Sequence, residues 1–430
     1  MKDMGKKFIP IWAIFIFFWL LTLPFTSNTT QDENHIKRLT FSGNNIVNFP
    51  CVSDDGRLLL YVIEIKNGGQ TTKALRVMNV ESGEDRELFR NGERKGLPPF
   101  QDTPLEIGSK PPVLSGDGQK AVFSLSLGEP ARLLDHYLAV VNTDGTEFWL
   151  THFPIESLQG KNLKSLDFTS SNWERISTYA VSSDGNRIAC SVKGHLGPRR
   201  YGNPSGVIFI DMATKSLKTI LAPDFAKSGW EWKAFPRSPL LGGGWAFCMS
   251  ANGERVVFGA QASEDSTDYD LYAVKWNEEA ARKITDFHDR WFSLADISND
   301  GEKVVFFYNG RKKQGIGTYC MNTDGSGLKF LESKKAPRVE LADMSGNGRY
   351  ILFKHVYRGM ILDLDKGTEK LAFDEETAGY IKGIIPMDFP RFPSFWCPKI
   401  LSFKGDRALL IGPPQGKESP EIYLLTIGLE

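Results

Sequence analysis

Hydrophobic and polar positions recur along the chain in a short unit of fixed spacing. A serine stands three residues before a glycine, and the third to fifth residues after that glycine are apolar in every copy. A representative copy runs from Ser182 through Gly185 to Cys190. The pairs are Ser53/Gly56, Ser115/Gly118, Ser182/Gly185, Ser250/Gly253, Ser298/Gly301, Ser345/Gly348 and Ser402/Gly405. Seven copies with unequal spacing indicate one structural repeat that carries variable loops.

The repeat predicts a β-hairpin. The residue before the glycine is Asp or Asn in six of the seven copies, and Lys404 is the exception. Asp-Gly and Asn-Gly tolerate the positive φ angles of a tight turn between antiparallel strands. The Ser and Asp side chains can bond nearby backbone NH groups. The apolar run that follows is short and rich in β-branched residues, which favours a buried strand. Arg or Lys stands one or two residues after each glycine.

Each repeat is predicted to contain four strands, the first ending at the serine and the second following the glycine. The predicted third strands are 74–80, 137–142, 207–211, 271–276, 318–322, 360–364 and 422–427. Outer strands are expected at 148–153, 281–287 and 369–373, and a similar segment, His35 to Phe41, precedes the first repeat. The last repeat lacks a fourth strand, so 35–41 should pair with 422–427. We therefore expect an all-β, seven-bladed β-propeller (alternatively six or eight blades) of four-stranded antiparallel sheets, closed by the N-terminal strand.

The Ser-x-Asp-Gly-x-Arg unit and the Arg38-Leu39-Thr40 outer strand resemble the TolB-like, WD40-like (PD40) repeats of bacterial extracytoplasmic propellers. The resemblance covers nearly all of 35–430. The tryptophan and proline common around the serine in TolB are absent from copies such as 52–56, and TolB has six blades. The resemblance therefore implies the repeat superfamily and an extracytoplasmic propeller, and does not extend to TolB's partners or role.

The N-terminus predicts export. Lys2, Lys6 and Lys7 precede an apolar run from Phe8 to about Phe25, which is typical of a signal peptide or signal anchor. We divide the chain into this segment at 1–27, a polar linker at 28–34 and the propeller at 35–430. The body is expected to be periplasmic, secreted or membrane-anchored, with any membrane contact made through the N-terminal segment.

Charge and cysteine content narrow the function classes. Lys and Arg total 52, as do Asp and Glu, so a nucleic-acid surface is disfavoured. The five cysteines are dispersed, and we interpret them as small buried apolar residues with at most one disulfide. The sequence contains no G-x-S-x-G, H-E-x-x-H or Walker A motif. The six histidines lack metal-ligand spacing, and no metal or cofactor is predicted.

Candidate binding residues cluster in long segments opposite the Ser-x-Asp-Gly turns. Function usually resides in long loops on a rigid scaffold, and aromatic residues with Arg are preferred interface anchors. The candidates are Trp173, His195, Arg199, Arg200, Tyr201, Trp230, Trp232, Arg237, His288, Trp291, Arg391 and Trp396. They favour a monomeric, non-catalytic scaffold that binds a protein, peptide or glycan of the cell envelope. The alternative is a polysaccharide lyase or glycoside hydrolase with its site in the same funnel, which would need paired carboxylates.

Overall fold

The fold was analysed in a computed structural model that divides into two units, residues 1–33 and residues 34–430. The structure describes only residues in the second unit. The described residues are 35–43, 45–93, 104–108, 110–127, 137–152, 175–193, 205–220, 247–261, 269–287, 292–308, 315–331, 340–355, 358–373, 404–412 and 421–429. In this part of the chain no helix is long and apolar enough to cross a membrane, and the segment 1–27 lies outside it.

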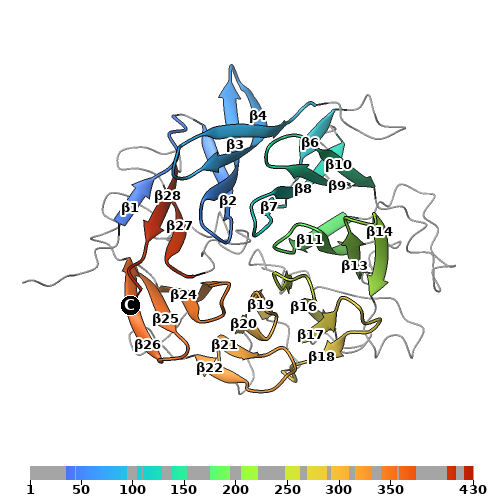
Figure 1. The fold of residues 1–430 in the computed structure, drawn as a ribbon, viewed down its shortest axis with the longest axis vertical. Helices are drawn as coiled ribbons and strands as arrows, with labels where there is room; N and C mark the ends of the chain where they lie inside the picture. Colours follow the sequence, from blue (N-terminus) through green and yellow to red (C-terminus); the bar gives the residue numbers. More distant parts are fainter. Residues whose placement is uncertain are drawn as a thin grey trace, which may run out of the picture. The chain divides into compact units, whose positions relative to one another are not determined.

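The described strands form seven small antiparallel sheets arranged as the blades of a β-propeller (Figure 1). Blade 1 comprises β2 (Ile46–Val52), β3 (Leu58–Asn67), β4 (Gln70–Asn79) and β5 (Asp85–Arg90). Blade 2 comprises β6 (Leu105–Ile107), β7 (Val113–Leu114), β8 (Lys120–Leu127), β9 (Tyr137–Asn142) and β10 (Phe148–His152). Blade 3 comprises β11 (Arg175–Val181), β12 (Arg187–Lys193), β13 (Ser205–Asp211) and β14 (Ser216–Ile220).

The remaining blades repeat the order. Blade 4 comprises β15 (Phe247–Met249), β16 (Arg255–Gln261), β17 (Tyr269–Lys275) and β18 (Arg282–Lys283). Blade 5 comprises β19 (Phe292–Ile297), β20 (Lys303–Tyr308), β21 (Gly317–Asn322) and β22 (Lys329–Leu331). Blade 6 comprises β23 (Glu340–Met344), β24 (Tyr350–His355), β25 (Arg358–Asp363) and β26 (Thr368–Phe373). Blade 7 comprises β27 (Arg407–Gly412), β28 (Glu421–Thr426) and β1 (His35–Arg38).

The two ends of the propeller share blade 7, as the sequence predicted. Strand β1 pairs antiparallel with β28, in a register from His35 opposite Thr426 to Arg38 opposite Tyr423. In Figure 1 the blue β1 lies beside the red β28. Leu39 NH continues the pairing by donating to Ile422 O at 2.8 Å. The predicted seven-bladed closed ring is therefore confirmed.

The Ser-x-Asp-Gly segments are turns with one repeated hydrogen-bond pattern. In six turns the serine Oγ donates to Oδ1 of the Asp or Asn at 2.5 to 2.6 Å. The same Oγ accepts from the backbone NH two residues after the glycine at 2.9 to 3.0 Å. These serines are at most 1% exposed. Their role is structural, because both hydrogen-bonding capacities of each hydroxyl are used within its own turn.

The turn glycines also join neighbouring blades. Gly253 has a φ of +67°, and a Cβ built on it would lie 2.7 Å from Cδ of Arg187 in blade 3. Across the closing seam, a Cβ on Gly56 would lie 2.8 Å from Cδ of Arg407. The long side chain that follows each glycine by two residues thus packs over the glycine of the next blade. This packing explains most of the basic residues that the sequence repeats after each glycine.

The core is a series of apolar clusters, most of them between adjacent blades. Phe123, Phe89 and Leu60 are fully buried where blades 1 and 2 meet, and Phe258, Tyr272 and Phe209 are buried where blades 3 and 4 meet. Leu409, Leu424 and Leu59 bury the seam between blades 7 and 1. Burial on both faces accounts for the uninterrupted apolar run of each second strand.

Two strands differ from the expectation. The inner strand of blade 2 is split into β6 and β7, which both pair with β8. Pro111 and Pro112 stand in the gap, and proline cannot donate to a strand ladder. The expected outer strand 281–287 is represented by only two paired residues, β18. Its continuation is held by one backbone bond, from Ile284 NH to Leu271 O, and by bonds from Thr285 Oγ1 and Phe287 NH to the Asp270 carboxylate.

Candidate functional site

The seven turns meet at one end of the ring, which we call the turn face. Neighbouring turns are joined by backbone bonds: Asp54 N to Gly116 O, Asp117 N to Ser183 O, Ser183 N to Ala251 O, Asn252 N to Asn299 O and Asn299 N to Gly346 O, at 2.6 to 3.4 Å. In blades 1 to 6, the turn between the first and second strands and the turn between the third and fourth strands lie at this face. The other connections begin and end at the opposite end, which we call the loop face.

A polar cluster joins three blades on the turn face. Asp54 of blade 1 accepts from Ser183 Oγ of blade 3 at 2.8 Å, and from Asn299 Nδ2 of blade 5 at 3.5 Å. A Cβ on Gly116 would lie 2.1 Å from Asp54 Oδ2, so only glycine leaves room for this contact. The cluster connects non-adjacent blades, and these contacts follow from ring closure.

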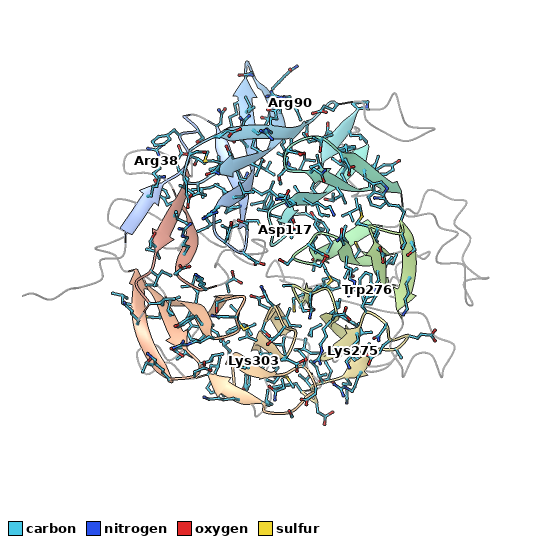
Figure 2. All side chains as sticks on the ribbon, viewed as in Figure 1. Arg38, Arg90, Asp117, Lys275, Trp276 and Lys303 are labelled. Carbon is cyan, nitrogen blue, oxygen red and sulfur yellow. The ribbon has the colours of Figure 1, made fainter. Side chains whose placement is uncertain are left out.

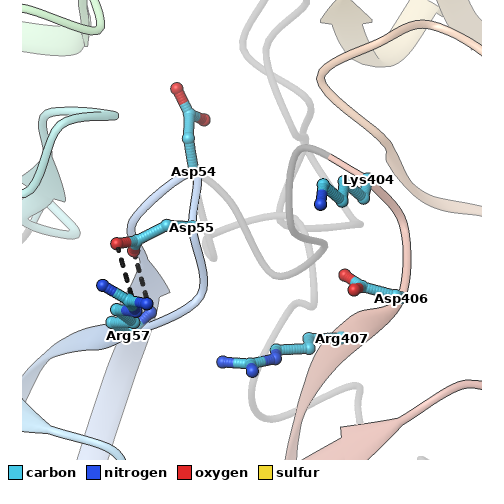
Figure 3. A pocket seen from close by; sticks show the side chains of 6 residues that line it. All are labelled: Asp54, Asp55, Arg57, Lys404, Asp406 and Arg407. Atoms are coloured by element: carbon cyan, nitrogen blue, oxygen red, sulfur yellow. Dashed lines mark hydrogen bonds and ion pairs between the residues drawn. The ribbon is translucent and has the colours of Figure 1, made fainter.

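A charged pocket of about 510 Å³ lies beside this cluster, between blades 1 and 7 (Figure 3). It is lined by Asp54, Asp55, Arg57, Lys404, Asp406 and Arg407. The Nε atom of Arg57 is 3.9 Å from Asp55 and 3.7 Å from Glu81, while Arg407 Nη2 is 3.9 Å from Glu81. The pocket therefore brings together cations from the first and last blades. Its volume is in the range of small-ligand sites.

Two carboxylates meet between blades 5 and 6 on innermost strands. Asp296 Oδ2 and Asp343 Oδ1 both accept from the backbone NH of Met344, each at 3.0 Å. Two oxygens at this distance from one nitrogen lie within about 6 Å of each other. Asp343 is 5% exposed. Register shifts at Ser293/Ala295 and Leu341/Asp343 precede the two carboxylates, and such bulges re-aim side chains.

A buried acid anchors the outer strand in two blades at the loop-face end. Glu421 is fully buried and accepts from Thr40 Oγ1 at 2.6 Å, Arg38 Nη2 at 2.8 Å and Ser42 NH at 2.9 Å. We call Arg38, Thr40, Ser42 and Glu421 the closure network. In blade 4, Asp270 accepts from Thr285 Oγ1 at 2.9 Å. The threonine of the Leu-Thr segment therefore has a structural role.

The described cysteines are not activated thiols. Cys51, Cys190 and Cys248 are buried, Cys320 is half-buried, and none of these four described cysteines forms a disulfide. Burial raises the pKa of the Cys190 thiol, and burial with the nearby Asp296 charge raises the pKa of Cys248. A thiol with a raised pKa is a poor nucleophile and metal ligand at neutral pH. The prediction of small buried apolar cysteines is confirmed for Cys51, Cys190 and Cys248, while Cys397 lies outside the described residues.

All twelve predicted binding residues lie outside the described part of the chain. They are Trp173, His195, Arg199, Arg200, Tyr201, Trp230, Trp232, Arg237, His288, Trp291, Arg391 and Trp396. Their roles stay predictions. The described strands nevertheless show that the segments carrying ten of them begin and end at the loop face. The segment 374–403, which carries Arg391 and Trp396, begins at the loop face and ends at the turn before β27. Among the described residues, no group of three or more His, Cys, Asp or Glu could hold a metal ion.

Sequence reasoning missed the Asp296–Asp343 pair and the cluster at Asp54. A signal for the pair was present in the repeats. Two residues before the serine, blades 1 to 4 carry Cys51, Val113, Ala180 and Cys248, whereas blades 5 and 6 carry Asp296 and Asp343. No comparable signal existed for Asp54, because its partners belong to distant repeats.

Comparisons with known proteins support the fold. No family model matches the chain, and no curated protein matches its sequence. The oligogalacturonate lyase of Vibrio parahaemolyticus has a similar structure, with a TM-score of 0.58 and 14% identity over 93% of this chain and 95% of that chain. At this identity the similarity establishes a common propeller fold and leaves the activity open.

Two other propellers match more weakly. The propeller domain of the Trilobed protease of Pyrococcus furiosus, which has an open velcro topology, gives a TM-score of 0.52 and 12% identity over 90% of this chain and 94% of that domain. TolB of Acinetobacter baumannii gives a TM-score of 0.39 and 13% identity over 85% and 78% of the two chains. The strand topology shows a seven-bladed β-propeller, and the finer assignment to TolB-like repeats stays a prediction.

Proposed function

We propose that the protein is an extracytoplasmic, TolB-like β-propeller that acts as a non-catalytic binding scaffold through its loop face. Its ligand would be a protein, peptide or glycan of the cell envelope. The apolar segment before residue 28 supports export, and the balanced charge disfavours a nucleic-acid ligand.

The contrast between the two faces carries this proposal. The described turn-face connections are short and bonded internally. At the loop face, by contrast, β10 and β11 are separated by 153–174 and β14 and β15 by 221–246, and the long segment 374–403 begins there after β26. These long segments hold six of the twelve candidate residues, all of them Trp or Arg. Aromatic and Arg side chains on a rigid ring are the expected anchors of a binding surface.

A carbohydrate-active enzyme is the second candidate, and the Asp296–Asp343 pair favours it. Glycoside hydrolysis uses two carboxyl groups within several ångströms of each other. The match to an oligogalacturonate lyase over nearly the full length of both chains is compatible with this candidate. The two acids already share the Met344 NH, and Asp343 is almost fully buried, so we rank this candidate below the scaffold.

Capture of partners by variant proteins tests the scaffold. Full-length protein in mild detergent would be used to capture partners from envelope extracts of the source organism. We expect Trp230→Ala combined with Trp232→Ala to remove the captured partner without lowering the melting temperature. Trp149→Ala, on the outer strand β10, is the matched control and should retain the partner. Equal capture by the wild type and the Trp230/Trp232 variant would contradict the loop-face assignment.

Turnover of polysaccharides tests the second candidate. Oligogalacturonate would be incubated with the wild type, Asp296→Asn and Asp343→Asn, with detection of reducing ends and of the unsaturated lyase product. Activity in the wild type that both substitutions abolish would favour the enzyme over the scaffold. Activity that survives both substitutions would exclude the carboxylate pair as its source.

A further inference from the structure

The repeat departs from its own pattern at one turn. Six turns carry Asp or Asn before the glycine, and the turn of blade 7 carries Lys404. The Asp or Asn oxygen accepts from the serine hydroxyl and from a backbone NH, as Asp184 does from Ser182 Oγ at 2.6 Å and Asn186 NH at 2.9 Å. A lysine ammonium has no acceptor and cannot replace these bonds. Lys404 therefore gives up a local stabilisation that every other turn keeps.

The lysine adds a cation to the charged pocket at the seam. Lys404 is exposed, and it forms no hydrogen bond or ion pair with any described residue. Figure 3 shows its side chain on the blade 7 wall, across the pocket from Asp54 and Asp55. Arg407 projects from the same wall, and Arg57 lies on the blade 1 wall. Three cationic side chains thus line one cavity of about 510 Å³.

Asp54 and Asp55 in the pocket accept hydrogen bonds at normal lengths, whereas the Arg57 guanidinium has only longer ion-pair contacts. Asp55 Oδ1 accepts from Ser53 Oγ at 2.6 Å and from Arg57 NH at 2.9 Å. Asp54 Oδ2 accepts from Ser183 Oγ at 2.8 Å. The guanidinium of Arg57, in contrast, has carboxylate oxygens only at 3.7 and 3.9 Å, beyond hydrogen-bond length, and its side chain is 62% exposed. The Arg57 guanidinium therefore retains anion-binding capacity.

We infer that this seam pocket binds a carboxylate of an acidic peptide segment, held by Lys404, Arg57 and Arg407. A planar guanidinium matches a carboxylate in two-point hydrogen bonding, and the ammonium adds a point charge. A singly charged group suits a cavity that also contains Asp54, Asp55 and Asp406, whose charges oppose a doubly charged phosphate. None of the six lining residues is aromatic, so the stacking platform common in sugar sites is missing from the described wall. This site lies on the turn face and does not depend on the proposed loop-face function.

A substitution that restores the repeat pattern tests the inference. Lys404→Asp reinstates the Asp-Gly turn and reverses the charge, so it should fold at least as well as the wild type. The probe is a fluorescein-labelled hexaglutamate peptide, titrated into full-length protein in mild detergent and followed by fluorescence anisotropy. We expect saturable binding that weakens with added salt, and a loss of about tenfold or more in affinity for Lys404→Asp at an unchanged or higher melting temperature.

Lys275→Asp is the matched control, because Lys275 is exposed on blade 4, away from the seam (Figure 2). The Lys275→Asp variant has the same change in net charge as Lys404→Asp and should bind the peptide as tightly as the wild type does. Failure of the wild type to bind, or equal affinity of Lys404→Asp and the wild type, would overturn the inference. Binding of trigalacturonate in preference to the peptide would also overturn it, in favour of an acidic glycan.

Discussion

The two faces of the propeller differ in how far their contacts repeat from blade to blade. On the turn face, six turns repeat one set of serine–carboxylate or serine–amide bonds, and most neighbouring turns are joined by backbone bonds. On the loop face the blades differ from one another. Buried acids anchor the outer strand in blades 4 and 7, at Asp270 and Glu421, while blade 2 places Leu138 opposite Thr151.

The difference shows how stability and variation are separated in this ring. A repeated turn with satisfied polar groups keeps the blades in register and leaves little room for change. Connections at the other end can vary in length, because loop closure costs grow slowly with length. We therefore expect turn-face substitutions to change stability, and loop-face substitutions outside the buried acids to change binding.

Removal of the closure network should give the largest effect. Glu421→Ala leaves Thr40 Oγ1 and the Arg38 guanidinium without their buried carboxylate, so we expect a loss of about 3 to 5 kcal/mol in the free energy of unfolding. Chemical denaturation of the full-length protein measures this loss. Glu81→Ala is the control, because Glu81 is an exposed ion-pair partner whose contribution should be about 1 kcal/mol or less. Similar losses for the two variants would show that β1 is not held by Glu421.

Crowding at a turn glycine should give the next largest effect. Gly253→Ala combines a positive φ with a Cβ 2.7 Å from Arg187 Cδ, so we expect a loss of about 2 to 4 kcal/mol. Gly83→Ala is matched, because it has a φ of +76° and nothing within 4 Å of the added Cβ. It should lose only the conformational part, about 1 to 2 kcal/mol. Equal losses would show that packing between blades 3 and 4 contributes nothing at this turn.

Acid should weaken the turn face by a smaller amount. The hydrogen bonds from Arg349 lower the pKa of Asp363. Burial opposes ionisation of Asp184, but bonds from Ser182 and Asn186 outweigh it and lower its pKa. A lowered folded-state pKa gives stability that is present above the unfolded pKa near about 4 and is lost as the pH falls through the folded value.

Melting temperatures measured between neutral pH and about pH 2.5 check this expectation, because stability should decline below about pH 4. Asp363→Asn should be less stable at neutral pH and should show a shallower decline. It keeps an oxygen that can accept from the NH groups of Asp365 and Lys366, so the turn itself is preserved. A decline identical to that of the wild type would exclude Asp363 as a contributor.

The repeated parts of this fold were predictable because they depend on local chemistry. Asp-Gly and Asn-Gly turns and uninterrupted apolar runs define strand order within a blade. The pairing of 35–41 with 422–427 followed from a surplus strand at one end and a missing strand at the other. The contact between Asp54 and Ser183 was not predictable, because it depends on how seven blades close around one axis.

The candidate sites were predictable only in part. The loop face was predicted to be the binding surface from its long segments and their aromatic and Arg content, and this stays a prediction. The residues involved belong to no repeat, so periodicity could not position them. Asp296 and Asp343 stand at an aligned position that is apolar or cysteine in blades 1 to 4, and comparison of the copies would have identified them. Lys404 was recognisable in the sequence as an exception to the repeat. Its position in a pocket shared with blade 1 could be recognised only in the structure.

Sharing a blade between β1 and β28 has a consequence for synthesis. The N-terminal strand leaves the ribosome before any of the seven repeats, yet its partner strand is made last. Until Glu421 and Ile422 have been synthesised, Thr40 Oγ1 lacks the Glu421 carboxylate to which it donates and the Ile422 NH from which it accepts. A chain released early therefore leaves β1 without its partner strand and exposes an unpaired strand edge.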